Sequence, residues 1–253
     1  MIQALSGTEA LARRQAVKSA GTGLVHWGAS YFGPRHSNAA PNVIGPDAQS
    51  LCTDMAPGEV IKAHFHCVSQ FQVYAAGAAL LGRHPVQPII LQYLDHHTAY
   101  GPITASPQGF SFFAMRARTD SGPVYLDKPG YKDVLRPSRR RSPLSEPLVL
   151  STEPVLENRS EASFEPLFPE AEYEDGLSAH LLRLGKGMSQ PAPDPDAAGG
   201  HYLFVVNGSL VREGRHYPRW SMLLALPGDE RIQITAGDQG LEVLVMQFPR
   251  EDA

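Results

Sequence analysis

Two histidines one residue apart, followed by a glutamine, interrupt a stretch of apolar and β-branched residues. The stretch reads GEVIKAHFHCVSQFQVYAAG and spans residues 58–77. Alternate side chains of a strand point to the same face, so His64 and His66 would project side by side. Neutral imidazoles are good ligands for Fe(II), Zn, Ni and Cu, so this pairing favours a metal site. The alternative is that both are ordinary histidines of the core or the surface.

The sequence around these histidines indicates an all-β protein. The chain has 253 residues with 23 glycines and 22 prolines, a composition that favours short strands joined by turns. One helix is expected near the start, where Ser6 and Glu9 fit a capping box and Gly21 can end the helix. A Pro-, Gly- and Asn-rich arm is expected over residues 28–46. Strand-like runs separated by turns occupy most of the remaining chain.

Charge and cysteine content restrict the classes of partner. The formal net charge of −4 gives no reason to expect binding to nucleic acid or to an anionic membrane. The two cysteines, Cys52 and Cys67, are too few for a disulfide framework. No run of about eighteen apolar residues is present, and the N-terminus lacks the pattern of a secretory signal. We therefore expect a soluble cytoplasmic protein without a nucleic-acid or membrane partner.

The two halves of the chain resemble each other. QFQVYAAG, which ends at Gly77, resembles HYLFVVNG, which ends at Gly208. A second glycine follows each of them 32 positions later, at Gly109 and Gly240. Two matching landmarks at one offset of 131 residues indicate an internal duplication of a β domain.

The duplication predicts a division of the chain into four parts. The segment RPSRRRSPLSEPL at 136–148 contains Pro, Ser and an arginine cluster, which is typical of a linker. The predicted parts are an N-terminal helix and arm over 1–44, a first β domain over 45–135, a linker over 136–160 and a second β domain over 161–253.

The spacing of the opening motif resembles a known pattern. Gly58, five residues, His64-x-His66, three residues, Gln70, six residues and Gly77 resemble the first motif of the cupin superfamily, which usually has Glu where this chain has Gln70. The resemblance covers roughly residues 45–125 and 165–250. It implies two tandem jelly-roll barrels, in which antiparallel sheets limit their exposed edges.

The resemblance also implies one divalent metal inside the first barrel, with Fe(II) expected and Zn, Ni or Mn as alternatives. By position the ligands would be His64, His66, Gln70 and a histidine from YLDHHTAYGP, residues 93–102. We expect His97 in this role, with His96 as the competitor. An ungapped count from the first motif instead reaches Tyr100 or Gly101, which a shortened hairpin would reconcile. The second barrel has Pro195 and Ala197 at the positions of the histidine pair, and we expect it to be a scaffold.

Three functions are consistent with this resemblance. The first is a non-haem metal dioxygenase acting on a small organic substrate. The second is a non-catalytic cupin that binds a small molecule or a metal. The third is a metal-assisted isomerase or lyase, which would need a general base such as Tyr100 or Asp95. Edge strands and a spare second barrel also lead us to expect a homodimer.

Overall fold

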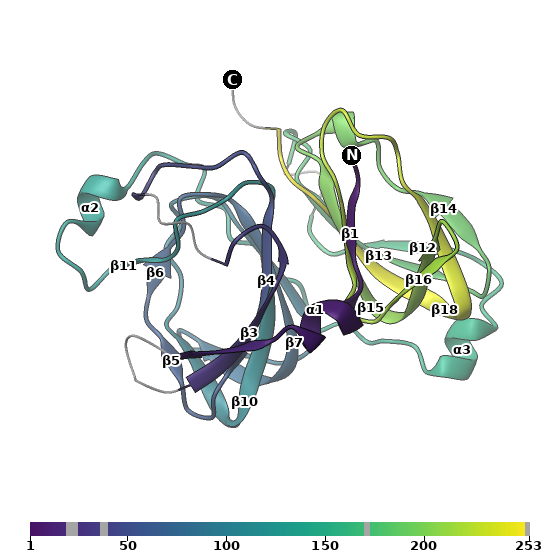
Figure 1. Ribbon diagram of the computed structural model, residues 1–253, viewed down its shortest axis with the longest axis horizontal. Coiled ribbons are helices and arrows are strands. Elements are labelled where there is room, and N and C mark those ends of the chain that lie inside the picture. Colours follow the sequence, from purple (N-terminus) through teal and green to yellow (C-terminus); the bar gives the residue numbers. More distant parts are fainter. Residues whose placement is uncertain (19–24, 36–39, 170–172, 251–253) are drawn as a thin grey trace. The chain divides into compact units, whose positions relative to one another are not determined.

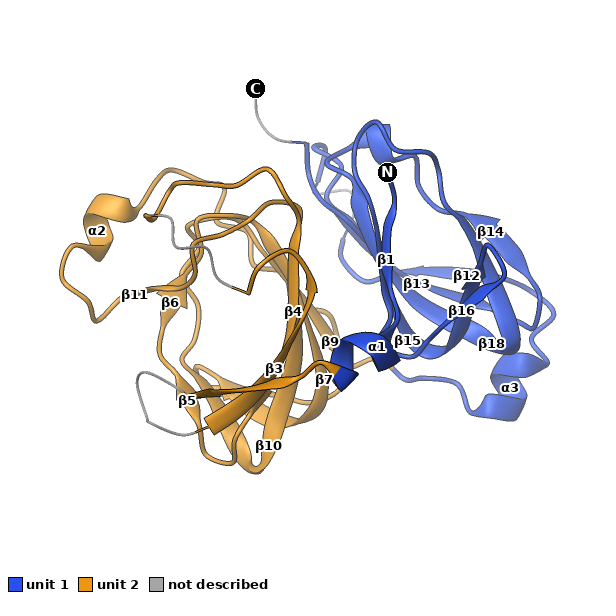
Figure 2. Ribbon diagram, viewed as in Figure 1, with its two compact units in different colours: residues 1–12, 149–253 blue, residues 13–148 orange. Residues whose placement is uncertain are grey.

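The computed structural model describes residues 1–18, 25–35, 40–169 and 173–250 of the chain (Figure 1). These residues form two compact units (Figure 2). We call residues 13–148, orange in Figure 2, the first unit because they hold the first barrel along the chain; residues 1–12 with 149–253, blue in Figure 2, are the second unit. About half of the chain is strand and less than a tenth is helix, which confirms the all-β prediction. The N-terminal residues contribute to the second unit, a division that differs from the four consecutive parts expected.

The first unit is built on one eight-stranded antiparallel sheet that curls into a barrel (Figure 1). Its strands, in spatial order, are β2 (Gln15–Lys18), β3 (Val25–Phe32), β4 (Gln49–Met55), β10 (Ile103–Arg116), β7 (Gln70–Leu81) and β8 (His84–Val86). β5 (Val60–Ile61) pairs with β10, and β9 (Ile90–Leu94) pairs with β7. A separate pair, β6 (His64–Phe65) and β11 (Val124–Tyr125), lies beside them, and α2 (Tyr131–Val134) follows.

The second unit repeats this architecture with another eight-stranded sheet. Its strands, in spatial order, are β1 (Gln3–Leu5), β17 (Met222–Ala225), β15 (His201–Arg212), β18 (Gln233–Gln247), β13 (Ser178–Leu184) and β12 (Ser163–Pro166). β14 (Ser189–Pro191) pairs with β18, and β16 (Arg215–Pro218) pairs with β15. Among its described residues, the helical elements are α1 (Gly7–Ala12), α3 (Glu153–Glu157) and a 3-10 turn (Pro195–Ala197).

The glycines that revealed the duplication have the same structural role in both barrels. Gly77 has a φ of 71°, and a Cβ on it would lie 2.2 Å from the carbonyl oxygen of Gly109. Gly208 has a φ of 66°, and a Cβ there would lie 2.1 Å from the carbonyl oxygen of Gly240. Only glycine fits a left-handed backbone at so close a crossing of two strands. The sequence spacing therefore reflects one packing constraint used twice.

The expected N-terminal helix is much shorter than its sequence suggests. α1 ends at Ala12, and residues 15–18 continue as β2, which pairs with β3. Backbone pairing with a neighbouring strand overrides the helix propensity of these residues. Gly21, the expected helix end, lies outside the described residues. No helix in the described part of the chain is long and apolar enough to cross a membrane.

The segment expected to be a linker packs along β9 in the first unit. The backbone N–H groups of Tyr93 and Asp95 donate to the carbonyl oxygens of Pro143 and Arg141. The N–H of Ser145 donates to a carbonyl oxygen of the same strand. These bonds satisfy part of the free edge of β9, so the segment belongs to the first barrel. The arm over residues 28–46 is expected to be ordered but irregular, and its first five residues, 28–32, are instead part of the regular strand β3.

The second barrel contains an isolated buried histidine. His201 is 0% exposed, and neither ring nitrogen has a hydrogen-bond partner among the described residues. Burial, and then the charge of Arg231, lower its pKa to about 4. The ring is therefore neutral at pH 7 and packs as part of the core.

The buried His201 predicts a pH-dependent stability of the second unit. Between pH 6.5 and pH 4, His201 is protonated in the unfolded state but stays neutral in the folded state. The free energy of unfolding therefore decreases as the pH falls, by about 3 kcal/mol in total. His201→Leu should remove this part of the pH dependence. Urea denaturation at several pH values, followed through Trp220 in a Trp27→Phe background, measures it. A parallel pH dependence in the parent and in His201→Leu would contradict the assignment.

Candidate functional site

The two histidines of the opening motif lie together in the wall of the first barrel. β6 places His64 opposite Tyr100, with which it exchanges two backbone hydrogen bonds of 3.1 and 3.0 Å. The rings of His64 and His66 are 5.2 Å apart between centroids and nearly perpendicular. Both side chains are buried, and both line a cavity of about 530 Å³. The prediction that these two rings share one face is thus met in the structure.

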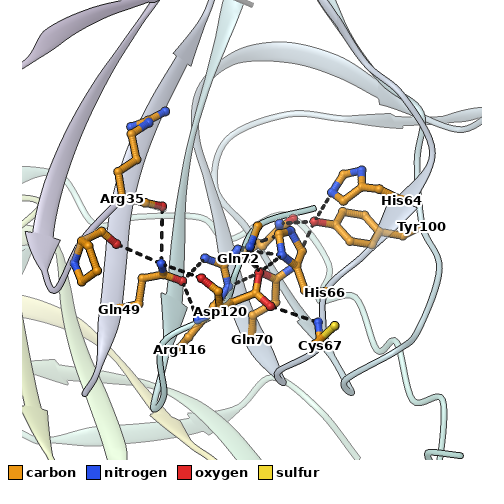
Figure 3. Close-up of polar contacts among 12 residues, drawn as sticks. Arg35, Gln49, His64, His66, Cys67, Gln70, Gln72, Tyr100, Arg116 and Asp120 are labelled. Atoms are coloured by element: carbon orange, nitrogen blue, oxygen red, sulfur yellow. Dashed lines mark hydrogen bonds and ion pairs between the residues drawn. The ribbon is translucent and has the colours of Figure 1, made fainter. Parts of the chain in front are cut away.

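The Tyr100 hydroxyl lies at the centre of the site and has three side-chain partners. Its oxygen is 2.9 Å from His64 Nε2, 2.9 Å from Gln70 Nε2 and 2.8 Å from Gln72 Nε2 (Figure 3). His64 Nδ1 is 2.7 Å from the Lys62 carbonyl oxygen, which can only accept, so Nδ1 carries the proton and Nε2 accepts. The hydroxyl therefore donates to His64 and accepts from both amides.

Burial keeps the Tyr100–His64 pair uncharged. Burial, and then the charge of His66, lower the pKa of His64 to about 3. Burial also raises the pKa of Tyr100 to about 12, although Arg116 and the two amide donors oppose this rise. Both shifts oppose transfer of the hydroxyl proton from Tyr100 to the His64 imidazole. The pair is therefore a neutral hydrogen bond at pH 7, unlike a general acid or base with a pKa near the working pH.

Arg116 places a fixed positive charge beside Gln70 and His66. Its Nε and Nη2 donate to Gln70 Oε1 at 3.0 and 2.7 Å, and its Nη1 donates to Gln49 Oε1 at 2.7 Å. Its Nη2 lies 3.3 Å from His66 Nε2. These contacts fix the Gln70 amide, with its oxygen toward Arg116 and its nitrogen toward Tyr100. Arg116 is only 4% exposed, so its charge acts in a region of low dielectric.

Asp120 balances this charge from the other side of His66. Its Oδ2 is 2.5 Å from His66 Nδ1, and its two oxygens accept the backbone N–H groups of Cys67 and Gly122. Burial alone would raise the pKa of Asp120, but the charge and hydrogen bond of His66, followed by the charge of Arg116, lower it to about 2. The carboxylate is thus ionised throughout the physiological range and orients the His66 ring.

His97, the expected third histidine, is joined to His66 through its backbone, whose N–H donates to the His66 carbonyl oxygen at 2.7 Å, but its side chain has other partners. It follows β9 in a turn with a φ of 58°, and its Nε2 is 2.7 Å from Asn42 Oδ1. Its Nδ1 is 2.8 Å from His96 Nδ1, and its ring contacts that of Phe65. Neither histidine is among the described residues that line the cavity. Tyr100 instead occupies the place opposite His64, which is the position that the ungapped count reached.

Asp95, expected as a possible base, has a structural contact set. Its carboxylate accepts from the Tyr93 hydroxyl at 2.9 Å. It also accepts from Arg141 through Nε and Nη2, each at 3.0 Å, and through the backbone N–H at 2.8 Å. These bonds attach the segment after residue 136 to β9. Asp95 does not line the cavity as the described residues define it.

The arrangement of these side chains does not fit a divalent metal. Among the described residues, no group of three or more His, Cys, Asp or Glu side chains could hold one. The Nε2 lone pair of His64 accepts a hydrogen bond from the Tyr100 hydroxyl, and Gln70 Oε1 accepts one from Arg116. A guanidinium between Gln70 and His66 would also repel a second cation. The site is instead a closed hydrogen-bond network with its own cation.

Three members of this network were missed by the sequence reasoning: Gln49, Arg116 and Asp120. Arg116 follows the run FSFFAM in β10 and alternates with Phe112 and Ala114, so the three side chains share one face of the strand. A charged residue on an otherwise apolar strand face indicates a buried charge. That parity was a usable signal. Gln49 on β4 and Asp120 after β10 lie outside the motif, so only the fold brings them to it.

The buried carboxylate predicts a large loss of stability on neutralisation. Asp120→Asn would leave Arg116 without its counter-charge and turn an amide toward donor groups, so the first unit should lose about 3 kcal/mol. Urea denaturation followed through Trp27 in a Trp220→Phe background measures this. Asp127→Asn, which removes an exposed ion pair with Lys62, is the matched control and should change little. Equal losses in both variants would refute the buried network.

Comparison with known proteins identifies the fold. No protein-family model matches the sequence, and no curated protein matches it. Among solved structures, the bacterial pirin YhhW of Escherichia coli in complex with nickel(II) is 14% identical over 99% of this chain and 100% of its own, with a TM-score of 0.58. A proposed dioxygenase of Nostoc punctiforme is 10% identical over 100% of this chain and 84% of its own, with a TM-score of 0.62.

A third similar structure is oxalate decarboxylase of Bacillus subtilis, studied for its Mn(II) centres. It is 12% identical over 99% of this chain and 78% of its own, with a TM-score of 0.55. All three are cupin-fold proteins. At these identities the likeness establishes architecture, in agreement with the repeated eight-stranded sheets. By structure, this chain therefore has the cupin fold, repeated in two barrels along the sequence.

Proposed function

We propose that the first barrel binds a small organic molecule through hydrogen bonds and charge, without a metal and without turnover. The observation that carries this proposal is the closed network around Tyr100, in which His64, Gln70 and Arg116 each have protein partners. A cavity of about 530 Å³ adjoins this network, within the range of small-molecule sites. Leu51, Ile103 and Phe112 give it an apolar wall.

The protonation states support binding over acid–base chemistry. A general acid or base works best with a pKa near the working pH, whereas the pKa values of His64 and Tyr100 are about 3 and about 12. The pair instead offers a rigid polar surface, since every hydrogen bond in it is already formed before a ligand arrives. Preorganisation of this kind reduces the entropy lost on binding.

A metal-dependent dioxygenase remains the second candidate. Two observations favour it: the adjacent imidazoles of His64 and His66, and the nickel(II) and Mn(II) centres of two proteins with the same fold. It would require Arg116 to leave Gln70 and Tyr100 to release His64. His64, His66 and Gln70 would then be the available ligands, and a divalent metal such as Fe(II) would supply the site for dioxygen activation.

Metal content separates the two candidates. Our proposal predicts well under one equivalent of Fe, Ni, Mn or Zn per chain in protein purified without an affinity tag, and no change in His64→Ala. Oxygen consumption with added Fe(II) and a panel of diketones, thiols and catechols should not exceed the buffer rate. A stoichiometric metal that is lost in His64→Ala, together with oxygen uptake, would establish the second candidate.

Small-molecule binding is tested by filling the cavity. Val60→Trp adds bulk to the cavity wall, and Val155→Trp, at an exposed site of the second unit, is the matched control. Ligand-observed NMR with a fragment panel should show fragments that bind the parent and Val155→Trp but not Val60→Trp. If no fragment binds, or if binding survives Val60→Trp, the proposal fails.

A further inference from the structure

Arg35 is held in a fixed position in the wall of the same cavity. Its Nη1 donates to the carbonyl oxygen of Cys52 at 3.1 Å, and its Nη2 donates to Thr53 Oγ1 at 3.1 Å. Its backbone is attached to the central network, because Gln49 Nε2 donates to the carbonyl oxygens of Pro34 and Arg35 (Figure 3). Figure 3 shows Arg35 and His64 at opposite ends of this network.

Gly28 leaves the space that the Arg35 guanidinium occupies. Gly28 lies on β3 opposite Thr53, and a Cβ on it would lie 1.9 Å from Arg35 Nη1 and 2.4 Å from its Cζ. The arginine head therefore packs directly against the Gly28 backbone. A side chain at position 28 would displace the guanidinium, so the observed position of Arg35 depends on glycine at this site.

The charge of Arg35 has no ion-pair partner among the described carboxylates, although the Asp54 carboxylate, which is paired with Arg14, is near enough to favour it. The Nε of Arg35 is buried and has no hydrogen-bond partner among the described residues. The nearby Glu59 carboxylate is engaged by His26 Nδ1 at 3.1 Å and by the Ala56 N–H at 2.9 Å. Arg35 Nη2 reaches this pair only at 3.5 Å, through His26 Nε2. A buried, unpaired donor on a cation is costly unless a ligand satisfies it.

We propose that Arg35 binds an anionic oxygen group, a carboxylate or a phosphate, on the molecule that the first barrel holds. The inference rests on the proposed binding function and adds the chemical class of the ligand. Lys18 and Lys128 also line the cavity and favour an anion, whereas the lining carboxylates Glu59 and Asp127 are engaged by His26 and Lys62. The apolar residues Ile103 and Phe112 lie in the wall as well, so the ligand combines an anionic head with an apolar body.

The experiment uses three probes that share an apolar body: benzoate, phenyl phosphate and neutral benzamide. Isothermal titration calorimetry with the full chain should show binding of benzoate or phenyl phosphate at least about tenfold tighter than that of benzamide, the effect of one charged hydrogen bond. The stronger of the two anions identifies the head group. Inorganic phosphate alone shows whether the anion suffices without the apolar body.

Substitutions test whether the preference for anionic probes depends on the position of the Arg35 guanidinium. Arg35→Gln should weaken the binding of the charged probe about tenfold or more and leave the affinity for benzamide unchanged. Gly28→Ala, which displaces the guanidinium while keeping its charge, should have the same effect. Ser30→Ala, an exposed substitution on the same strand, should have none. Circular dichroism and thermal melting show whether each variant folds. If either Arg35→Gln or Gly28→Ala does not fold, the other one still tests the role of Arg35.

The outcomes separate this inference from the proposed function. Charged and neutral probes of equal affinity, or charged probes unaffected by Arg35→Gln and Gly28→Ala, would overturn the role of Arg35 while leaving a cavity that binds small molecules. Failure of all three probes would also overturn it. If the fragment panel fails in the same way, the proposed function falls as well.

Discussion

The hydrogen bond from Tyr100 to His64 determines what the first barrel can do. It uses the lone pair that His64 would otherwise offer to a metal, and it turns the amides of Gln70 and Gln72 toward the hydroxyl oxygen. Once Gln70 presents its nitrogen there, its oxygen faces Arg116, which also bonds to Gln49. A single contact thus sets the orientation of the surrounding polar side chains. The site carries a guanidinium against Gln70 and His66, two of the ligands that the sequence motif predicted.

Charge balance explains why so polar an interior is tolerated. The ionised Asp120 compensates Arg116 and fixes His66, and burial keeps His64 and Tyr100 neutral. A buried network of this kind is stable only when its members are satisfied. Arg35 differs, because its Nε has no partner among the described residues. The second barrel has kept the fold without the network: its counterpart of Gln70 is His201, whose ring nitrogens are likewise without partners in the part of the chain that the structure describes.

Much of the fold was predictable because its constraints are local or repeated. The glycines Gly77 and Gly208 each mark a strand crossing that admits no side chain, so their spacing survives in both halves. Strand parity also placed His64 and His66 on one face. The short helix α1 and the role of His97 were not predictable in this way. The first depends on pairing with β3, and the second depends on a turn whose left-handed residue directs the ring toward Asn42. Arg116 and Asp120 come from other elements, and motif spacing does not report on them.

The state of the His64 imidazole is the most direct test of this account. Long-range ¹H–¹⁵N NMR correlations, assigned with a His64→Gln variant, report the tautomer and charge of the ring. The account predicts a neutral ring protonated at Nδ1 from pH 5 to pH 8, unchanged by Fe(II), Ni(II) or Mn(II). It further predicts that Tyr100→Phe shifts the Nε2 resonance. Titration of the ring near pH 6.5, or a metal-induced shift or broadening of Nε2, would contradict the account.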